Sequence, residues 1–410
     1  MVSKQALSIV RHFLFLQGMP CDFFKVVGDT LEQHGHRVSR INLCFYDWLF
    51  WHDRRALNYR GRRQGWPDFL QRFLADQTVT DLVLLGEQRK YHKEAVALAR
   101  ACGVRVMVTD FGYFRPDWIT LEPNGMGGES TMPRDAAAIL ALAQGLPEVD
   151  FTPCFQDSTW RMSLGELAGS MGDVLFKWLY PHYQQSLERP HPLVYNPAMV
   201  RALLRRKWRA RRVAALYQAL RAGGRPYFVF PLQLDYDFQI RAYSPYPGMG
   251  AAIAEVLESF ARHAPRGCDL WVKTHPWDPG IIDWEGQVGV AADRLDVAGR
   301  VHFLDGGSLD DMMAGARGVV TVNSTSGLKA LQLGCPVQVL GQAVYDVAGL
   351  THAGGVDAFW AAPVPPQLPL LDAFIKLLVH HSQVRGVFFD PQGKQAAVRL
   401  FVDRLLIAPP

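Results

Sequence analysis

Apolar and polar positions along the chain alternate between short buried runs and amphipathic stretches. The first half predicts strands over 9–16, 37–43, 81–85 and 104–109, and helices over 22–34, 91–101, 135–144, 160–190 and 199–221. The second half predicts strands over 227–232, 269–274, 300–304, 318–322 and 336–340, and helices over 249–263, 308–315, 326–333 and 370–382. Strands that alternate with helices favour parallel sheets with right-handed crossovers, so we expect the α/β class.

The length of 410 residues suits two domains better than one core. Gly223 and Gly224 end a basic helix and mark the expected boundary. We therefore predict an N-terminal Rossmann-like domain over 1–198, a basic linker helix over 199–224 and a C-terminal Rossmann-like domain over 225–410. A cleft is expected between the two domains.

Composition narrows the functional classes. The net charge of +4 hints at anionic ligands without requiring nucleic acid, and no nucleic-acid partner is expected. Six scattered cysteines with no CxxC pair argue against a zinc site or a disulfide scaffold and fit a reducing compartment. The apolar stretch between Lys4 and Arg11 is too short for a signal peptide, and no apolar run predicts a membrane-spanning helix.

The stretch Tyr227–Ile240 organises the second half. It begins as an apolar strand, breaks at Pro231 and carries two carboxylates, Asp235 and Asp237. A carboxylate at a strand end can act as a nucleophile or a general base. An aspartate there is also typical of a turn or a helix N-cap, and this alternative stays open.

Two further loops follow predicted strands and should open at the same sheet edge. Lys273 and His275 lie in a Lys-Thr-His-Pro loop that suits a phosphate leaving group, although a packed histidine beside a surface lysine fits equally. The segment Val322–Gly327 runs from a strand through Asn and hydroxyl residues into a helix, which predicts an anion cradle or an ordinary Ser/Thr N-cap. The three loops together favour a phosphate-bearing donor.

Six segments resemble the capsule polysaccharide biosynthesis family, in the right order and over nearly the whole chain. They are Phe15–Gly18, Gly112–Glu122, Pro231–Ile240, Lys273–Pro276, Val322–Gly327 and Gly349–His352. The likeness is greatest to single-module transferases of 3-deoxy-D-manno-oct-2-ulosonic acid (Kdo) that are linked to capsule export. This resemblance implies a GT-B fold and retaining transfer of β-Kdo from CMP-β-Kdo to a lysophosphatidylglycerol, which starts the poly-Kdo linker of a capsule.

The resemblance also implies roles for individual residues. Asp237 matches the carboxylate that attacks the donor, His275 takes part in catalysis, and Glu122 or Asp110 supplies a second carboxylate. The expected donor-binding residues are Gln233, Lys273, His275, Asn323, Ser324, Thr325, Ser326 and Gly327. The expected acceptor-binding residues are Gln17, Gly18 and Arg115. Asp110 and Lys329 depart from the family pattern, which more often has Glu at the first position and in some relatives an acidic residue at the second.

A protonated His275, Lys273 and the helix N-terminus near Ser324 could neutralise the leaving CMP without a metal or other cofactor, and no DxD motif lies where a divalent ion would be needed. Other interpretations keep the donor but change the acceptor to a sugar, make the chain a non-catalytic nucleotide- or lipid-binding subunit of capsule assembly, or make it a sugar-nucleotide epimerase. The basic helix over 199–221 predicts either a patch for anionic lipid or a solvated interdomain helix. We expect a cytoplasmic protein, peripheral at the inner membrane, with capsule assembly proteins as possible partners.

Overall fold

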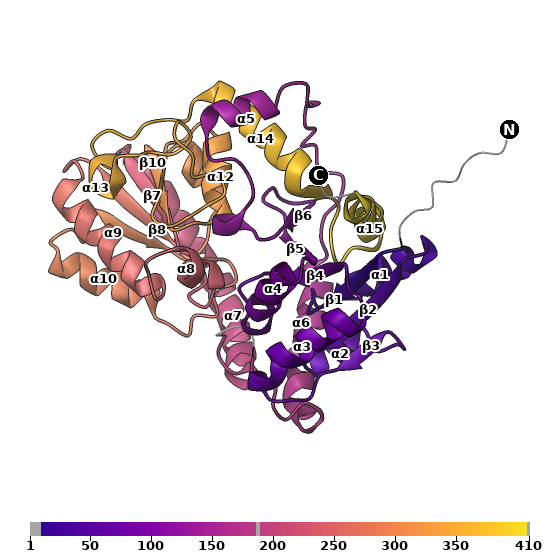
Figure 1. The fold of residues 1–410 in the computed structure, drawn as a ribbon. Coiled ribbons are helices and arrows are strands. Elements are labelled where there is room, and N and C mark those ends of the chain that lie inside the picture. Colours follow the sequence, from indigo (N-terminus) through magenta and orange to yellow (C-terminus); the bar gives the residue numbers. More distant parts are fainter. Residues whose placement is uncertain (1–9, 186–188, 408–410) are drawn as a thin grey trace. The chain divides into compact units, whose positions relative to one another are not determined.

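A computed structural model describes residues 10–185 and 189–407, which form two compact units, each built on its own sheet (Figure 1). The first unit combines Met1–Met126 with Asp150–Ser186 and Ser382–Pro410, and the second combines Gly127–Val149 with Leu187–His381. The expected α/β class with parallel sheets is confirmed. The cleft of a GT-B architecture stays a prediction. The first residue of the first predicted strand, Ile9, and the stretch after Lys4 lie outside the described residues.

The sheet of the first unit has seven strands in the order β12-β6-β5-β4-β1-β2-β3. Neighbouring strands from β3 to β5 pair in parallel, whereas β6 runs antiparallel to β5 and to β12. The strands are β1 (His12–Phe15), β2 (Arg37–Asn42), β3 (Ala56–Asn58), β4 (Asp81–Leu85), β5 (Arg105–Phe111), β6 (Trp118–Pro123) and β12 (Gln383–Arg385). The helices are α1 (Phe23–Gln33), α2 (Phe45–Phe50), α3 (Trp66–Asp76), α4 (Lys90–Ala101), α6 (Thr159–Leu175) and α15 (Pro391–Leu406), with short 3-10 turns at Arg63–Gly65 and Lys177–Leu179. Both β1 and β4 are buried throughout; β4 has the predicted bounds, whereas β1 is shorter than the predicted stretch 9–16.

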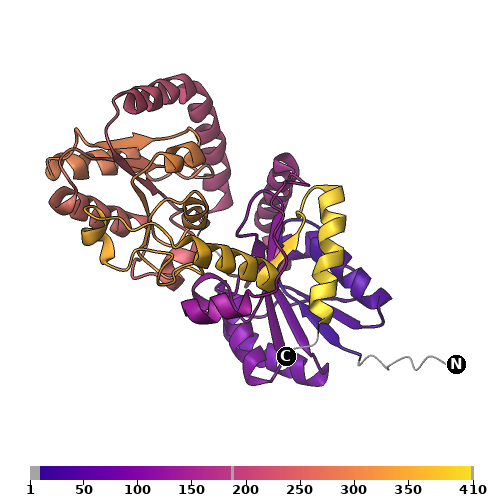
Figure 2. The same ribbon diagram turned by 90° about the horizontal axis from the view of Figure 1, so that it is seen from above.

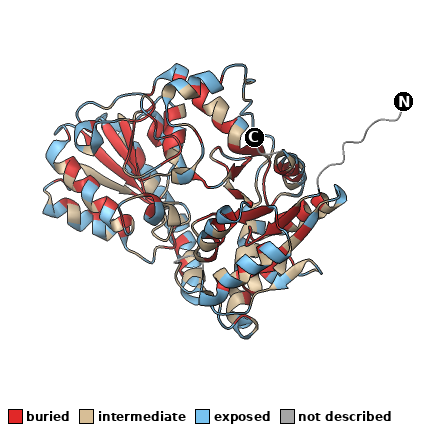
Figure 3. Cartoon of the chain, in the orientation of Figure 1, coloured by how far each residue is buried: buried red, intermediate tan, exposed pale blue. Residues whose placement is uncertain are grey.

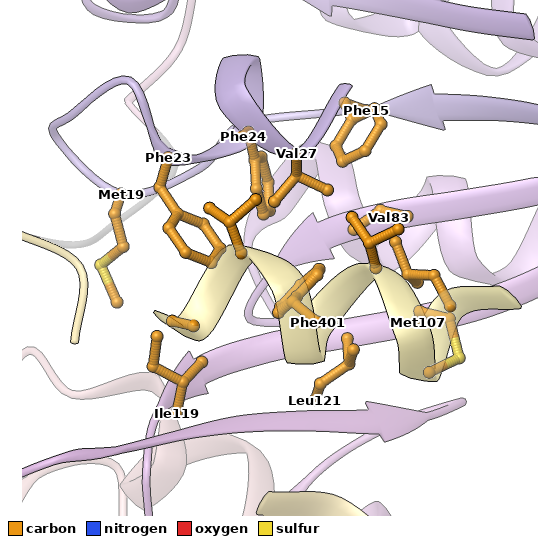
Figure 4. Close-up of a cluster of buried hydrophobic side chains, with 14 of the residues drawn as sticks. Phe15, Met19, Phe23, Phe24, Val27, Val83, Met107, Ile119, Leu121 and Phe401 are labelled. Carbon is orange, nitrogen blue, oxygen red and sulfur yellow. The ribbon is translucent and has the colours of Figure 1, made fainter. Parts of the chain in front are cut away.

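The predicted domain boundaries differ from these units, because 127–149 belong to the second unit and the C-terminal end belongs to the first. β12 pairs with β6, and α15 packs against α1, so residues from 382 onward complete the first unit. Figure 4 shows Phe401 of α15 among the side chains of α1 and the sheet, and its ring meets Phe23 edge-on at 5.3 Å between centroids. The yellow α15 lies against the indigo start of the chain (Figure 2). Residues 225–410 are therefore not one domain.

The sheet of the second unit has five strands, all parallel, in the order β11-β10-β7-β8-β9. The strands are β7 (Tyr227–Pro231), β8 (Asp269–Lys273), β9 (Val301–Leu304), β10 (Gly318–Thr321) and β11 (Val337–Val339). The helices are α5 (Ala136–Leu142), α7 (Pro192–Ala222), α8 (Phe238–Tyr243), α9 (Met249–His263), α10 (Trp284–Arg294), α11 (Leu309–Ala314), α12 (Thr325–Gln332), α13 (Gly355–Phe359) and α14 (Leu368–Ser382), with a 3-10 turn at Gly127–Glu129. The central strands are buried, whereas the helices carry exposed residues on their outer sides (Figure 3).

Two predicted helices differ from the observed ones. The helix predicted over 160–190 is α6, which ends at Leu175; 186–188 of that range lie outside the described residues. The basic helix begins earlier than expected, at Pro192, and it belongs to the second unit and is not a free linker. In the described part of the chain, no helix is both long and apolar enough to cross a membrane.

Candidate functional site

Three loops of the second unit open at one sheet edge, as the sequence predicted. They follow β8, β7 and β10, which are neighbours in the parallel sheet, and Pro231 at the end of β7 pairs with Lys273 at the end of β8. With strands about 4.8 Å apart, the three strand ends span about 10 Å. Parallel strands place their carboxyl ends together, which is where open α/β sheets bind ligands.

Gln233 and Asn323 join the first and third of these loops. The Gln233 Nε2 donates to Asn323 Oδ1 at 2.9 Å, and the backbone N–H of Asn323 donates to Gln233 Oε1 at 3.1 Å. Asn323 Nδ2 also donates to the carbonyl of Gln239 at 2.8 Å. These contacts give both residues a role in shaping the loops, and their predicted donor contacts stay a prediction.

Asp237 begins the short helix α8. Its Oδ1 accepts the backbone N–H of Gln239 at 3.0 Å, so the N-cap alternative considered from the sequence is present. Asp235 contributes to a different helix, because its Oδ1 accepts the N–H of Met249 at 2.8 Å. The N-cap orients the Asp237 carboxylate at the strand-end edge, and its role as nucleophile stays a prediction.

Lys273 and His275 lie on the second loop. Lys273 is only 6% exposed at the end of β8, and burial lowers its pKa while the nearby charge of Asp305 acts in the opposite direction. The N–H of Trp277 donates to His275 Nδ1 at 3.1 Å. This bond assigns the proton of a neutral imidazole to Nε2. The protonated His275 expected from the sequence would have to lose that bond, and its role at the phosphate stays a prediction.

An arginine of α7 holds the backbone of this loop. Arg206 donates through Nε to Asp305 Oδ1 at 2.8 Å and through Nη2 to the carbonyls of Asp278 and His275 at 2.9 and 3.2 Å. Its Nη1 donates to the carbonyl of Pro276. This role was not predicted from the sequence, which places Arg206 in a basic helix. Arg206 lies eight and four residues after the buried Ala198 and Ala202 and so shares the inner side of the helix, but which side is buried is known only from the structure.

The third loop ends at the N-terminus of α12. Ser324 caps this helix. Its Oγ accepts hydrogen bonds from the backbone N–H of Ser326 at 3.2 Å and from the Ser326 hydroxyl at 2.9 Å. Thr325 is exposed and Gly327 is buried beneath the Tyr345 hydroxyl, where an added Cβ would lie 2.2 Å from that oxygen. The N-cap alternative is therefore present here too. A helix N-terminus with hydroxyls beside it can still bind an anion.

The remaining candidates lie in the first unit. Gln17 follows β1 and is 4% exposed, and its side-chain oxygen accepts a hydrogen bond from Arg89 Nη1 at 3.0 Å. Gly18 leaves no room for a side chain, because a Cβ there would lie 2.7 Å from the ring of Phe24. Arg115 is exposed, with its guanidinium 4.5 Å from the centre of the Phe111 ring. Their predicted contacts with an acceptor stay a prediction.

Asp110 and Glu122 share one face of the first sheet. Asp110 on β5 pairs with Thr120, and Glu122 on β6 pairs with Val108, which makes the two carboxylates diagonal neighbours. Burial raises the pKa of Asp110, while Arg89 and Arg115 act in the opposite direction. Glu122 is fully buried and accepts from the Tyr113 hydroxyl at 3.3 Å. Both belong to the first unit and Asp237 to the second, and the catalytic role expected of the two carboxylates stays a prediction.

The comparisons with known proteins decide the family. The model of the capsule polysaccharide biosynthesis protein family matches residues 80–389. The chain belongs to this family. It is 30% identical over 397 residues, 94% of each chain, to the capsule polysaccharide modification protein LipB of Neisseria meningitidis, and 28% identical over 386 residues, 92% of this chain and 97% of the other, to the capsule polysaccharide export protein KpsS of Escherichia coli.

Solved structures that resemble this family member are more distant. The β-Kdo 2,7 transferase of KpsC from Thermosulfurimonas dismutans is 16% identical, with a TM-score of 0.46 over 96% of this chain and 100% of that chain. A UDP-GlcNAc 2-epimerase from Neisseria meningitidis is 12% identical, with a TM-score of 0.31 over 97% of this chain and 100% of that chain. In the described ranges, no three or more His, Cys, Asp or Glu side chains are grouped to hold a metal ion.

Proposed function

We propose that the chain is a glycosyltransferase that moves β-Kdo from CMP-β-Kdo to a lysophosphatidylglycerol, with retention, and so starts the poly-Kdo linker of a capsule. Membership of the capsule polysaccharide biosynthesis family supports the setting. The resemblance of the six sequence segments to capsule-linked Kdo transferases suggests the donor and acceptor. We place its action at the cytoplasmic face of the inner membrane.

The observation that carries the proposal is the convergence at the carboxyl ends of β8, β7 and β10. A buried lysine, a histidine with its Nε2 as the expected donor, and a capped helix N-terminus with hydroxyls lie on adjacent strand-end loops. Positive charge and N–H donors at one edge suit the phosphate of a departing nucleoside monophosphate. Asp237 follows the central strand of the three, between the two anion-binding loops.

The proposed reaction runs in two displacements. The Asp237 carboxylate attacks the anomeric carbon of Kdo while the bond to the phosphate oxygen breaks, and CMP leaves with the bonding electrons. An acceptor hydroxyl then attacks the same carbon, displaces Asp237 and gives up its proton to a base. Glu122 and Asp110 are the candidates for that base. Lys273 and His275 stabilise the charge that develops on the departing phosphate.

Incubation with CMP-Kdo, generated in situ, and a fluorescent lysophosphatidylglycerol analogue tests this proposal by mass spectrometry. The expected product is heavier than the acceptor by one Kdo residue. Release of CMP and free Kdo without that product would move the proposal to a sugar acceptor. An isomerised sugar nucleotide would replace it with an epimerase, and the absence of any CMP release would leave a binding subunit.

A further inference from the structure

Helix α7 divides its cations between two faces. The inward face packs on the second unit: Ala198, Ala202 and Tyr217 are buried, and Arg206 holds the His275 loop. Arg209 on the same face contacts Glu285 at 2.8 Å. These contacts remove the inner arginines from any surface patch, and they show that α7 is not simply a solvated linker.

The opposite face combines a row of exposed apolar side chains with cations. Leu193, Val200, Leu204 and Trp208 are 56, 58, 64 and 84% exposed, and their spacing of seven, four and four residues places them on one side of the helix. Lys207, Arg211 and Arg212 are exposed on and beside this row. The 31 residues of α7 include no Asp or Glu.

We propose that this outward face of α7, defined by Leu193, Val200, Leu204, Lys207, Trp208, Arg211 and Arg212, docks onto the surface of an anionic lipid bilayer. The proposal deepens the proposed function, since it supplies a way for the enzyme to reach a lipid acceptor. It rests on the geometry of the helix and does not require that transfer of Kdo be correct.

Charge and side-chain chemistry select a bilayer over other occupants. Tryptophan beside aliphatic residues, flanked by Lys and Arg and without carboxylates, is typical of a helix that lies in the membrane interface. The core of a protein interface is depleted in charge, which does not fit Lys207 and Arg211 within the row. A nucleic-acid surface presents mainly phosphate and sugar, which would leave most of the apolar row around Val200 and Leu204 without apolar contact. An anionic headgroup layer above acyl chains satisfies both kinds of side chain.

Sedimentation with vesicles tests the proposal on the full chain. Vesicles of phosphatidylcholine alone are compared with vesicles of equal parts phosphatidylcholine and phosphatidylglycerol. The chain is expected to bind the anionic vesicles, more weakly as salt is added. The triple variant Lys207→Glu, Arg211→Glu, Arg212→Glu is expected to bind the anionic vesicles at least about 100-fold more weakly than the wild type, because each cation near the surface contributes about 1 kcal/mol. Trp208→Ser is expected to weaken binding about tenfold.

Matched controls separate the face from general effects. The variant Lys93→Glu, Arg266→Glu, Arg399→Glu reverses three other exposed cations and has the same net charge as the test variant, and it should bind as the wild type does. Trp178→Ser removes another exposed tryptophan, 72% exposed, next to α6. Circular dichroism checks that each variant folds.

Several results would overturn the proposal. Vesicle binding should not be unchanged in the α7 charge variant, nor fall equally in the Lys93, Arg266 and Arg399 control. It should not fall in Trp178→Ser while it is kept in Trp208→Ser. A dimer in solution that Trp208→Ser converts to a monomer would show that the face binds a second copy of the chain. Normal vesicle binding in a chain that transfers no Kdo would instead reject the proposed function and leave the docking face in place.

Discussion

The side-chain amides of Gln233 and Asn323 hold the loops after β7 and β10 together. Each residue both donates to and accepts from the other, with distances of 2.9 and 3.1 Å, and Gln233 is only 5% exposed. Because Asn323 directly precedes the α12 N-cap, this pair also sets where the helix N-terminus lies relative to the β7 loop. Two residues expected to touch the donor are thereby tied to each other.

Substitution of Gln233 by Ala should destabilise the second unit and weaken binding of CMP. The change leaves the N–H and the side-chain oxygen of Asn323 without their Gln233 partner, which costs about 1–3 kcal/mol for a buried group. Urea unfolding and calorimetric titration with CMP measure the two effects. Gln218→Ala, at an exposed position of α7, is the control and should change neither. An unaltered midpoint in Gln233→Ala would contradict the importance of the pair.

Substitution of Asp237 by Asn should separate its two roles. Asn is as good an N-cap as Asp, so α8 and the stability should be kept, whereas a carboxamide cannot act as the nucleophile. We expect transfer to be lost while the affinity for CMP remains. Asp237→Ala should lose transfer and also about 1 kcal/mol of stability with the cap. Full turnover by Asp237→Asn would exclude the nucleophilic role.

Replacement of Arg206 by Lys should loosen the loop that carries His275. A lysine keeps the charge near Asp305 but cannot match the guanidinium fork that contacts Asp305 and the backbone carbonyls of that loop. We expect the KM for the donor to rise about tenfold with a smaller change in kcat, and amide exchange over 274–278 to become faster. Arg212→Lys on the exposed side of the same helix serves as the control. A purely structural role would lower stability without changing KM.

The stability of the first unit should fall as the pH rises through the neutral range because of Asp173. Burial raises the pKa of this carboxyl from 3.8 to about 7, although the N–H of Tyr46 donates to it. The folded state then binds the proton more tightly than the unfolded chain does. The stabilisation is complete below about pH 4 and is lost progressively up to about pH 7, with an upper bound of about 4 kcal/mol.

Asp173→Asn checks this sign. The neutral amide can still accept from Tyr46, so urea unfolding should give a variant more stable than the wild type near pH 8 and similar to it only below about pH 4. A wild type whose stability increases from about pH 5 to about pH 8, with no gain from the substitution, would show that Asp173 titrates normally.

Local patterns predicted most of the elements, and long-range pairing explains the error in the domain boundary. The bounds of β4 and α9 agree with prediction because each is a continuous apolar or amphipathic run between clear stops. β12 has only three residues, and its partner β6 lies some 260 positions earlier, so nothing in its own sequence indicates which sheet it joins. The prediction that 225–410 form one domain was wrong for that reason.

The sequence predicted which loops of the second unit lie together at one sheet edge. Strand-end position and chemistry pointed to Lys273, His275, Asn323 and Ser324, and adjacent parallel strands bring their loops together. The support from Arg206 could not be predicted, because an arginine within a run of arginines shows which side of the helix it occupies only when the packing partner of the helix is known.

The late position of β12 and α15 has a consequence for synthesis on the ribosome. β6 ends at Pro123 and β12 begins at Gln383, so the first unit emerges long before its last strand and helix. At roughly 5–20 residues per second, that interval is on the order of tens of seconds. During it, Phe23 and the rest of the surface that α15 later covers have no partner from that helix. Part of the apolar surface of the first unit is therefore without its final cover for that interval, because the unit that begins first is completed last.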